Sequence, residues 1–178
     1  MGTRHLIEVV SNGVHKVAQY GQWDGYPSGQ GVTVLDFLRN NNMADFKTAV
    51  DGCWFVTQSV IRQYYIDAGD NPDNTSGFIS IDISSRFERE HPTLCRDVGA
   101  RILKMILDSK TGVELIDSSS FANDTTFCEF VYSIDLDRNT LSCYECGKTN
   151  KFYECSIFDV PSDKDFLDTY EKWSKERE

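Results

Sequence analysis

The sequence has no long hydrophobic run and few histidines, and each shortage excludes a class of protein. No apolar stretch approaches the ~20 residues of a membrane helix or the core of a signal peptide, so we expect a cytosolic protein with no membrane partner. The three histidines are scattered, and no Gly-x-Ser-x-Gly elbow is present, so no catalytic constellation is recognisable. Hydrophobic residues nevertheless make up 40% of the 178 residues, which excludes a disordered chain.

Basic residues are also in short supply. The 18 Lys and Arg face 28 Asp and Glu, for a net charge of -10, which disfavours long nucleic acids and anionic membranes as partners. The first forty residues are balanced, with three charges of each sign: Arg4, Lys16 and Arg39 against Glu8, Asp24 and Asp36. The overall charge therefore does not disfavour a small anion bound near the N-terminus.

The six cysteines are predicted to be free thiols, because the chain is long for a disulfide scaffold and looks cytosolic. Cys143 and Cys146 have the spacing of a zinc knuckle, but no second knuckle follows. A zinc site built from Cys143, Cys146 and Cys155, with Cys128 or a histidine as fourth ligand, is the alternative.

The pattern of the chain predicts the order of its elements. Residues 4–10 and 14–20 alternate in polarity around Asn12-Gly13, which indicates a β-hairpin. Helices are expected from Thr33 (with Thr33 and Asp36 as a capping box) to the asparagines at 40–42, over 44–50 and 54–67, and after Pro92. A loop at 68–76 and a short strand at 78–83 are expected between the last two helices.

The last third is predicted to be mostly strands. These cover 113–116, 127–136, 140–145 and 151–158, with a turn at 137–139, and a final helix follows Pro161. Because the elements are grouped rather than alternating, we predict one α+β domain over residues 1–178. Its sheet is mainly antiparallel, formed by the N-terminal hairpin and the C-terminal meander, and packs with the helical middle segment and the C-terminal helix.

The segment from Tyr20 to Gly31 is the most informative for function, because four glycines and three aromatic residues share it. Glycine-rich loops before a helix present N–H groups to phosphates, and aromatic rings stack on bases. The predicted ligand-binding residues are Arg4, Lys16, Tyr20, Trp23, Asp24, Tyr26, Ser28 and Arg96. In the alternative interpretation, Trp23 and Tyr26 fill the core and the glycines only permit tight turns.

An enzyme is the second alternative. An N-terminal nucleophile hydrolase needs Thr, Ser or Cys at the mature N-terminus, but here Gly2 would lead and Thr3 comes one residue late. A hydrolase that uses His91 or Thr3 on a nucleotide or amide stays open as a hypothesis, and no cofactor is indicated.

Several stretches together resemble a family of short proteins of bacteria and their phages. They are residues 1–6 (MGTRHL), 17–31 (VAQYGQWDGYPSGQG), 91–103 (HPTLCRDVGARIL) and 130–137 (FVYSIDLD). The resemblance implies a phage or mobile-element context, in which small acidic proteins of the host cytosol counter defence by trapping signalling nucleotides. The resulting hypothesis is sequestration of a cyclic nucleotide or ADP-ribose derivative without catalysis. A homo-oligomer is compatible with it, and an inhibitor of a host defence protein is the third alternative.

Overall fold

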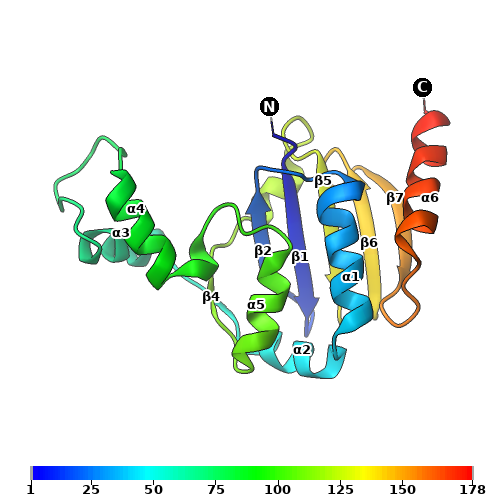
Figure 1. Ribbon diagram of the computed structural model, residues 1–178, viewed down its shortest axis with the longest axis horizontal. Coiled ribbons are helices and arrows are strands. Elements are labelled where there is room, and N and C mark those ends of the chain that lie inside the picture. Colours follow the sequence, from blue (N-terminus) through cyan, green and yellow to red (C-terminus); the bar gives the residue numbers. More distant parts are fainter. Residues whose placement is uncertain (1, 178) are drawn as a thin grey trace.

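The computed structural model describes residues 2–177 and is built on a five-stranded sheet (Figure 1). Its strand order is β2-β1-β5-β6-β7, and every neighbouring pair is antiparallel except β1 and β5. The five strands are β1 (His5–Ser11), β2 (Val14–Gly21), β5 (Phe130–Asp135), β6 (Thr140–Glu145) and β7 (Asn150–Ser156). The prediction of an α+β fold with a mainly antiparallel sheet is confirmed.

The N-terminal hairpin forms as expected. Asn12 and Gly13 join β1 to β2 with φ values of 54° and 72°, the left-handed conformation that a two-residue hairpin turn requires. The C-terminal meander is also confirmed, and Asn139 takes a positive φ at the turn between β5 and β6.

The parallel pairing of β1 with β5 was not predicted. It runs in register from His5 opposite Phe130 to Val10 opposite Asp135. The amino ends of these two strands therefore lie side by side, although 125 positions separate them in the sequence.

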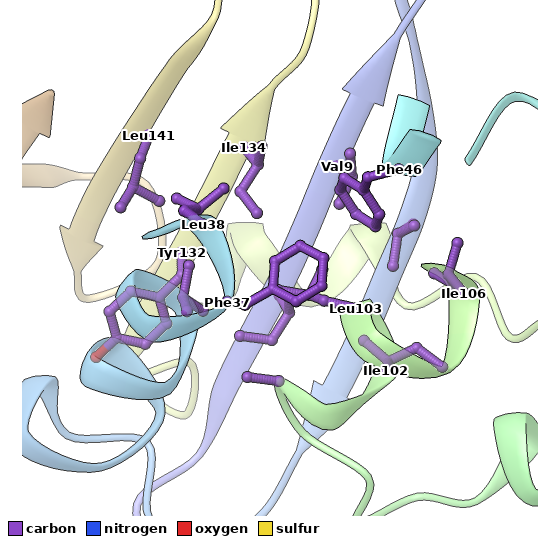
Figure 2. Close-up of a cluster of buried hydrophobic side chains, with 14 of the residues drawn as sticks. Val9, Phe37, Leu38, Phe46, Ile102, Leu103, Ile106, Tyr132, Ile134 and Leu141 are labelled. Atoms are coloured by element: carbon purple, nitrogen blue, oxygen red, sulfur yellow. The ribbon is translucent and has the colours of Figure 1, made fainter. Parts of the chain in front are cut away.

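Four helices cover one face of the sheet. They are α1 (Val32–Asn40), α2 (Met43–Asp51), α5 (Arg101–Ser109) and α6 (Asp163–Lys175). Figure 2 shows Phe37, Phe46 and Leu103 from these helices facing strand residues such as Val9 and Tyr132. All five side chains are buried, so the main core lies between this helical layer and the sheet.

The opposite face of the sheet has a thinner cover. The short 3-10 helix Ser119–Asn123 packs Ala122 and Phe121 against Leu6 and Val131. Beside it, Glu8 is buried and its Oε2 lies 2.5 Å from Nζ of Lys148 in the β6–β7 turn. No helix among residues 2–177 has both the length and the apolar character needed to cross a membrane.

Two helices stand away from the sheet and form what we call the arm, residues 58–90 (Figure 1). The arm consists of α3 (Gln58–Asp67), a loop and α4 (Ile81–Glu90), packed around Ile61 and Phe87. It follows a two-residue strand, β3 (Trp54–Phe55), which pairs in parallel with β4 (Glu114–Leu115).

Several predicted boundaries in the first two thirds of the chain are wrong. The expected helix at 54–67 begins only at Gln58, where Thr57 caps it. No strand forms at 78–83: residues 78–80 end the loop, and α4 begins at Ile81, where the Ser80 side chain caps it by accepting from the Ile83 N–H. After Pro92 comes a single 3-10 turn, and α5 begins only at Arg101.

The capping box predicted for α1 does not form either. Thr33 lies inside the helix, and its hydroxyl donates to the Gly29 carbonyl at 3.0 Å. The chain enters α1 through a one-turn π-helix at Pro27–Gly31 instead.

Candidate functional site

The aromatic- and glycine-rich segment after β2 is anchored on the amino ends of β1 and β5. The Gly25 N–H donates to the Thr3 carbonyl at 3.0 Å, and the buried Tyr132 hydroxyl donates to the Gly25 carbonyl at 2.8 Å. A Cβ on Gly31 would lie 3.1 Å from the rings of Phe166 and Tyr132. The segment is therefore a fixed part of the body, held by both strands and by the C-terminal helix.

The π-helix and the residues before it leave little room around their glycines. Asp24 has φ 59°, and its carbonyl accepts the Gln30 N–H at 2.9 Å. A Cβ on Gly29 would come within 2.3 Å of that carbonyl. Close packing against Asp24 and against the rings of Phe166 and Tyr132 thus explains Gly29 and Gly31 without a phosphate. Ser28, just before Gly29, is exposed.

Trp23 and Tyr26 do not fill the core. The Trp23 side chain is 55% exposed and Tyr26 is about half exposed. Tyr26 packs against Phe130, with the two ring centroids 6.0 Å apart. The interpretation in which these rings plug the interior is wrong, because about half of each side chain is open to solvent.

Arg4 lies at the same end of the sheet. Its N–H donates to Oε1 of Glu129 at 3.0 Å, and its guanidinium lies 5.0 Å from the ring centroid of Phe127, which is itself about half exposed. The Arg4–Phe127 pair and the segment that carries Trp23 and Tyr26, which is held at Thr3, thus belong to the same edge of the sheet. We call this set, Arg4, Trp23, Tyr26 and Phe127, the amino-end site.

A cleft of about 270 Å³ opens beside Tyr26. Thr126, Glu129 and Glu145 line it with hydroxyl and carboxylate oxygens. Tyr170 of α6 closes one side, and its hydroxyl donates to Oε1 of Glu145 at 3.2 Å. Burial, together with the Glu145 carboxylate, raises the pKa of Tyr170 to about 12, so it stays a donor at neutral pH. The cleft can accept hydrogen bonds from hydroxyl or amino groups of a ligand.

Tyr20 and Arg96 form a second, separate pair. The Arg96 guanidinium lies 5.3 Å from the Tyr20 ring centroid, and Phe121 packs edge-on against the same ring at 4.9 Å. Arg96 also lines a cavity of about 600 Å³ between α4 and α5. Tyr20 and Arg96, which the sequence predicted as ligand-binding residues, therefore contact each other, but outside the amino-end site.

Lys16 does not join either group. Its Nζ donates to the Asp51 carbonyl at the end of α2, 3.0 Å away. The register places Lys16 level with Val9 and Val10, five positions along β1 from Arg4, or roughly 16 Å at ~3.3 Å per residue. Arg4, and not Lys16, supplies the positive charge of the amino-end site.

Thr3 and His91, the two residues that the hydrolase alternative invokes, lie in different surroundings, and the nearby His5 is buried. Thr3 is buried, and its carbonyl is occupied by Gly25. His5 is sealed beneath Gly21, and burial lowers the pKa of its imidazole to about 4, an effect that the Thr3 backbone only partly offsets. His91 lies at the base of the arm, with Nδ1 2.8 Å from Oε1 of Glu114.

The cysteines form no metal cluster in the described part of the chain. Cys143 points into the core, where burial raises its pKa well above the usual value, and burial also raises the pKa of Cys155 to about 11. Cys146 lies apart, at a positive φ on the rim of the cleft. The zinc hypothesis therefore finds no support in the arrangement of the thiols.

Sequence reasoning missed Phe127, Glu129 and Glu145. They lie at the site because β5 pairs in parallel with β1. A local sequence pattern does not predict such a pairing. No protein-family model, curated protein or solved structure matches this chain.

Proposed function

We propose that the protein binds a small nucleotide-derived signalling molecule at the amino-end site and sequesters it without chemistry. The observation that carries this proposal is that the half-exposed rings of Trp23 and Tyr26 and the Arg4–Phe127 pair belong to one edge of the sheet, that of the amino ends of β1 and β5. Exposed aromatic rings are costly to leave in water, and a rigid frame holds these three in place.

Each part of the site has a matching part in such a ligand. A base stacked on Trp23 or Tyr26 gains about 1–3 kcal/mol per ring. Arg4 neutralises a phosphate, and Asp24 or the carboxylates of the cleft accept from ribose hydroxyls. The net charge of -10 opposes long polyanions, so the ligand is a cyclic nucleotide or an ADP-ribose derivative rather than a nucleic acid.

The biological role that fits this chemistry is removal of a defence signal in the cytosol of a bacterial host. The resemblance to phage proteins described above suggests this role. A sequestering protein also needs only an open binding site and no catalytic groups. Thr3, one of the two residues that the hydrolase alternative invokes, is buried.

Thermal-shift measurements with cyclic dinucleotides and ADP-ribose derivatives test the proposal. A ligand at 100 times its dissociation constant stabilises the fold by ~2.7 kcal/mol, which raises the melting temperature by several degrees. Trp23→Ala and Arg4→Gln should abolish that shift. Trp54→Ala is the matched control, because Trp54 is 53% exposed but lies on β3, and Arg177→Gln removes a guanidinium stacked on Trp173.

Two outcomes contradict the proposal. One is the absence of any shift at millimolar ligand, and the other is an equal loss of the shift in Trp23→Ala and Trp54→Ala. Mass analysis of the ligand after incubation and denaturation separates binding from cleavage: intact ligand supports sequestration, whereas fragments identify a hydrolase.

A further inference from the structure

The cleft beside Tyr26 has the size and the walls of a subsite for one part of a nucleotide. Its volume is about 270 Å³, whereas pockets that enclose a whole drug-sized ligand measure about 300–1,000 Å³. The Phe130 ring lies 6.0 Å from that of Tyr26 and 5.9 Å, edge-on, from that of Tyr170. Aromatic walls of this kind suit the flat face of a base.

The backbone donors around the cleft are already engaged. The Thr126 N–H donates to Oδ1 of Asp124 at 3.0 Å. The Glu129 N–H donates to the Arg4 carbonyl at 3.2 Å, and the Cys146 N–H donates to the Glu129 carbonyl at 3.0 Å. Among residues 2–177, no lysine, arginine or histidine lines the cleft. The cleft therefore offers a ligand mainly acceptors, and it fits a group that donates hydrogen bonds.

The two carboxylates of the cleft differ in how far they are occupied. Oε1 of Glu145 accepts from the Tyr170 hydroxyl at 3.2 Å, and Oε2 accepts from the Arg177 guanidinium at 3.3 Å. Oε1 of Glu129 accepts from the Arg4 N–H at 3.0 Å, but Oε2 accepts from no residue among 2–177. Glu129 is therefore the carboxylate that is open to a ligand.

A free carboxylate distinguishes between the purine bases. Guanine carries two donors side by side, N1–H and the 2-amino group, and a carboxylate accepts from both in a charge-assisted pair of hydrogen bonds. Adenine has a lone pair at N1 beside its amino group, and that lone pair repels a carboxylate oxygen. Because each carboxylate oxygen has two lone pairs, Oε1 of Glu129 can keep the Arg4 N–H while it takes part in this contact.

We propose that the cleft binds a guanine base and that Glu129 selects it by accepting from N1–H and the 2-amino group. Tyr26 stacks on the base, and Arg4, whose N–H already holds Glu129, neutralises the adjoining phosphate. Asp24 is left for a ribose hydroxyl. This inference rests on the proposed function, and it narrows the ligand to a guanine-containing cyclic nucleotide.

Calorimetric titration with matched nucleotides tests the choice of base. The pairs are cyclic GMP with cyclic AMP, and cyclic di-GMP with cyclic di-AMP. In at least one pair the guanine member should bind at least ~10-fold more tightly, as expected for a bidentate contact to a base. Equal affinities, or a preference for adenine, overturn the guanine inference and leave sequestration standing. If no member binds at millimolar concentration the inference also fails, and if ADP-ribose derivatives fail as well, the proposed function fails with it.

Glu129→Gln tests the residue that makes the choice. The glutamine carbonyl keeps the Arg4 N–H as its partner, while the amide NH2 opposes the N1–H of guanine. Affinity for the guanine nucleotide should fall about 10-fold and affinity for its adenine counterpart should not, so the preference disappears. Glu171→Gln is the control, because Glu171 pairs with Lys175 on the exposed side of α6, outside the cleft. An equal loss for both nucleotides in Glu129→Gln would indicate a structural role and overturn the assignment.

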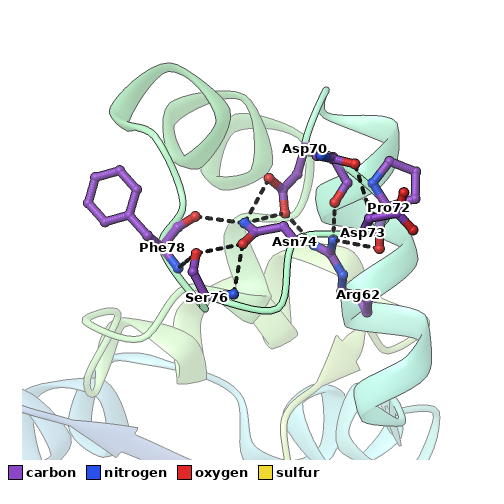
Figure 3. A network of polar contacts seen from close by, with 8 residues as sticks. Arg62, Asp70, Pro72, Asp73, Asn74, Ser76 and Phe78 are labelled. Atoms are coloured by element: carbon purple, nitrogen blue, oxygen red, sulfur yellow. Dashed lines mark hydrogen bonds and ion pairs between the residues drawn. The ribbon is translucent and has the colours of Figure 1, made fainter.

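Hydrogen exchange locates the bound nucleotide. The guanine nucleotide that binds should slow amide exchange in residues 125–130 and leave the arm, residues 58–90, unchanged. The arm is a suitable internal reference because its loop is held by its own polar contacts: Arg62 forms an ion pair with Asp70, which also accepts from the Asn74 amide (Figure 3). Slower exchange in the arm without any change at 125–130 would place the ligand elsewhere and overturn the proposal.

Discussion

The sheet body and the arm are stabilised in different ways. In the body, residues far apart in sequence share one core: Phe46 of α2 packs in the same cluster as Tyr132 of β5 and Phe166 of α6. The arm's cluster draws mainly on one stretch of chain, with Ile61, Ala68, Phe87 and Leu94 as its buried residues. The arm is therefore expected to open by itself, while the body unfolds as one unit.

The largest effect should come from truncating a core ring in the body. Phe46 is fully buried and packs edge-on against Phe37 at 4.8 Å, so Phe46→Ala should cost about 3–5 kcal/mol of global stability. Phe87→Ala removes a comparably buried ring from the arm and should speed amide exchange there, with the midpoint of body unfolding unchanged. Urea denaturation combined with hydrogen exchange measures both. An equal drop in midpoint for the two variants would show that the arm and the body unfold together.

Acid sensitivity should reside in the body, at His5. Its folded pKa of about 4 lies below the unfolded value of 6.5, so between these values the unfolded state binds more protons. Stability is highest above pH 6.5 and falls as the pH drops toward 4, by about 3 kcal/mol in total from this group. His5→Gln should remove this part of the pH dependence. Denaturation at pH 7 and pH 4 measures it, and identical pH slopes for wild type and variant would refute the assignment.

Local sequence patterns predicted the elements at the two ends of the chain well and those in the middle poorly. Asn12 and Gly13 encode their own turn, and Phe166, Tyr170 and Trp173 mark the inner side of α6 at helical spacing. At Phe78–Ile83 the β-branched residues favoured a strand, but the cap at Ser80 and the packing of Ile83 in the arm stabilise a helix instead.

Only some residues of the candidate site could be predicted from the sequence, for a related reason. Trp23 and Tyr26 lie in an unusual local composition, which the sequence displays directly. Phe127 and Glu129 join them through the parallel β1–β5 pairing, and Lys16 is separated from Arg4 by the length of a strand. Both outcomes depend on long-range register, which local periodicity does not encode.

A medium effect is expected from the buried ion pair on the thinly covered face of the body. Lys148→Met leaves the Glu8 carboxylate buried and without its close cationic partner, since His15 is 3.8 Å away, and should cost about 1–3 kcal/mol. Lys151→Met is the control, because Lys151 pairs with Glu154 on the exposed surface of the adjacent strand. Urea midpoints compare the two. An equally small effect in both variants would show that Glu8 is effectively solvated.

The smallest effect should appear at the joint between arm and body. Glu114 of β4 accepts from the Tyr64 hydroxyl of α3 at 2.8 Å and lies equally close to Nδ1 of His91, after α4, so one carboxylate joins both ends of the arm to the body. Glu114→Gln should speed amide exchange in residues 58–90 a few-fold without moving the body's unfolding midpoint.

The contact between Tyr64 and Glu114 can also be tested at alkaline pH. The hydrogen bond to Glu114 raises the pKa of Tyr64 above its usual value of 10, because only the neutral phenol can donate. The contribution of this bond is therefore complete below pH 10 and is lost as the pH rises through the folded pKa. Glu114→Gln should lower the pKa of one tyrosine in an ultraviolet titration. If that titration is unchanged while arm exchange still quickens, His91 rather than Tyr64 is the contact that holds the arm.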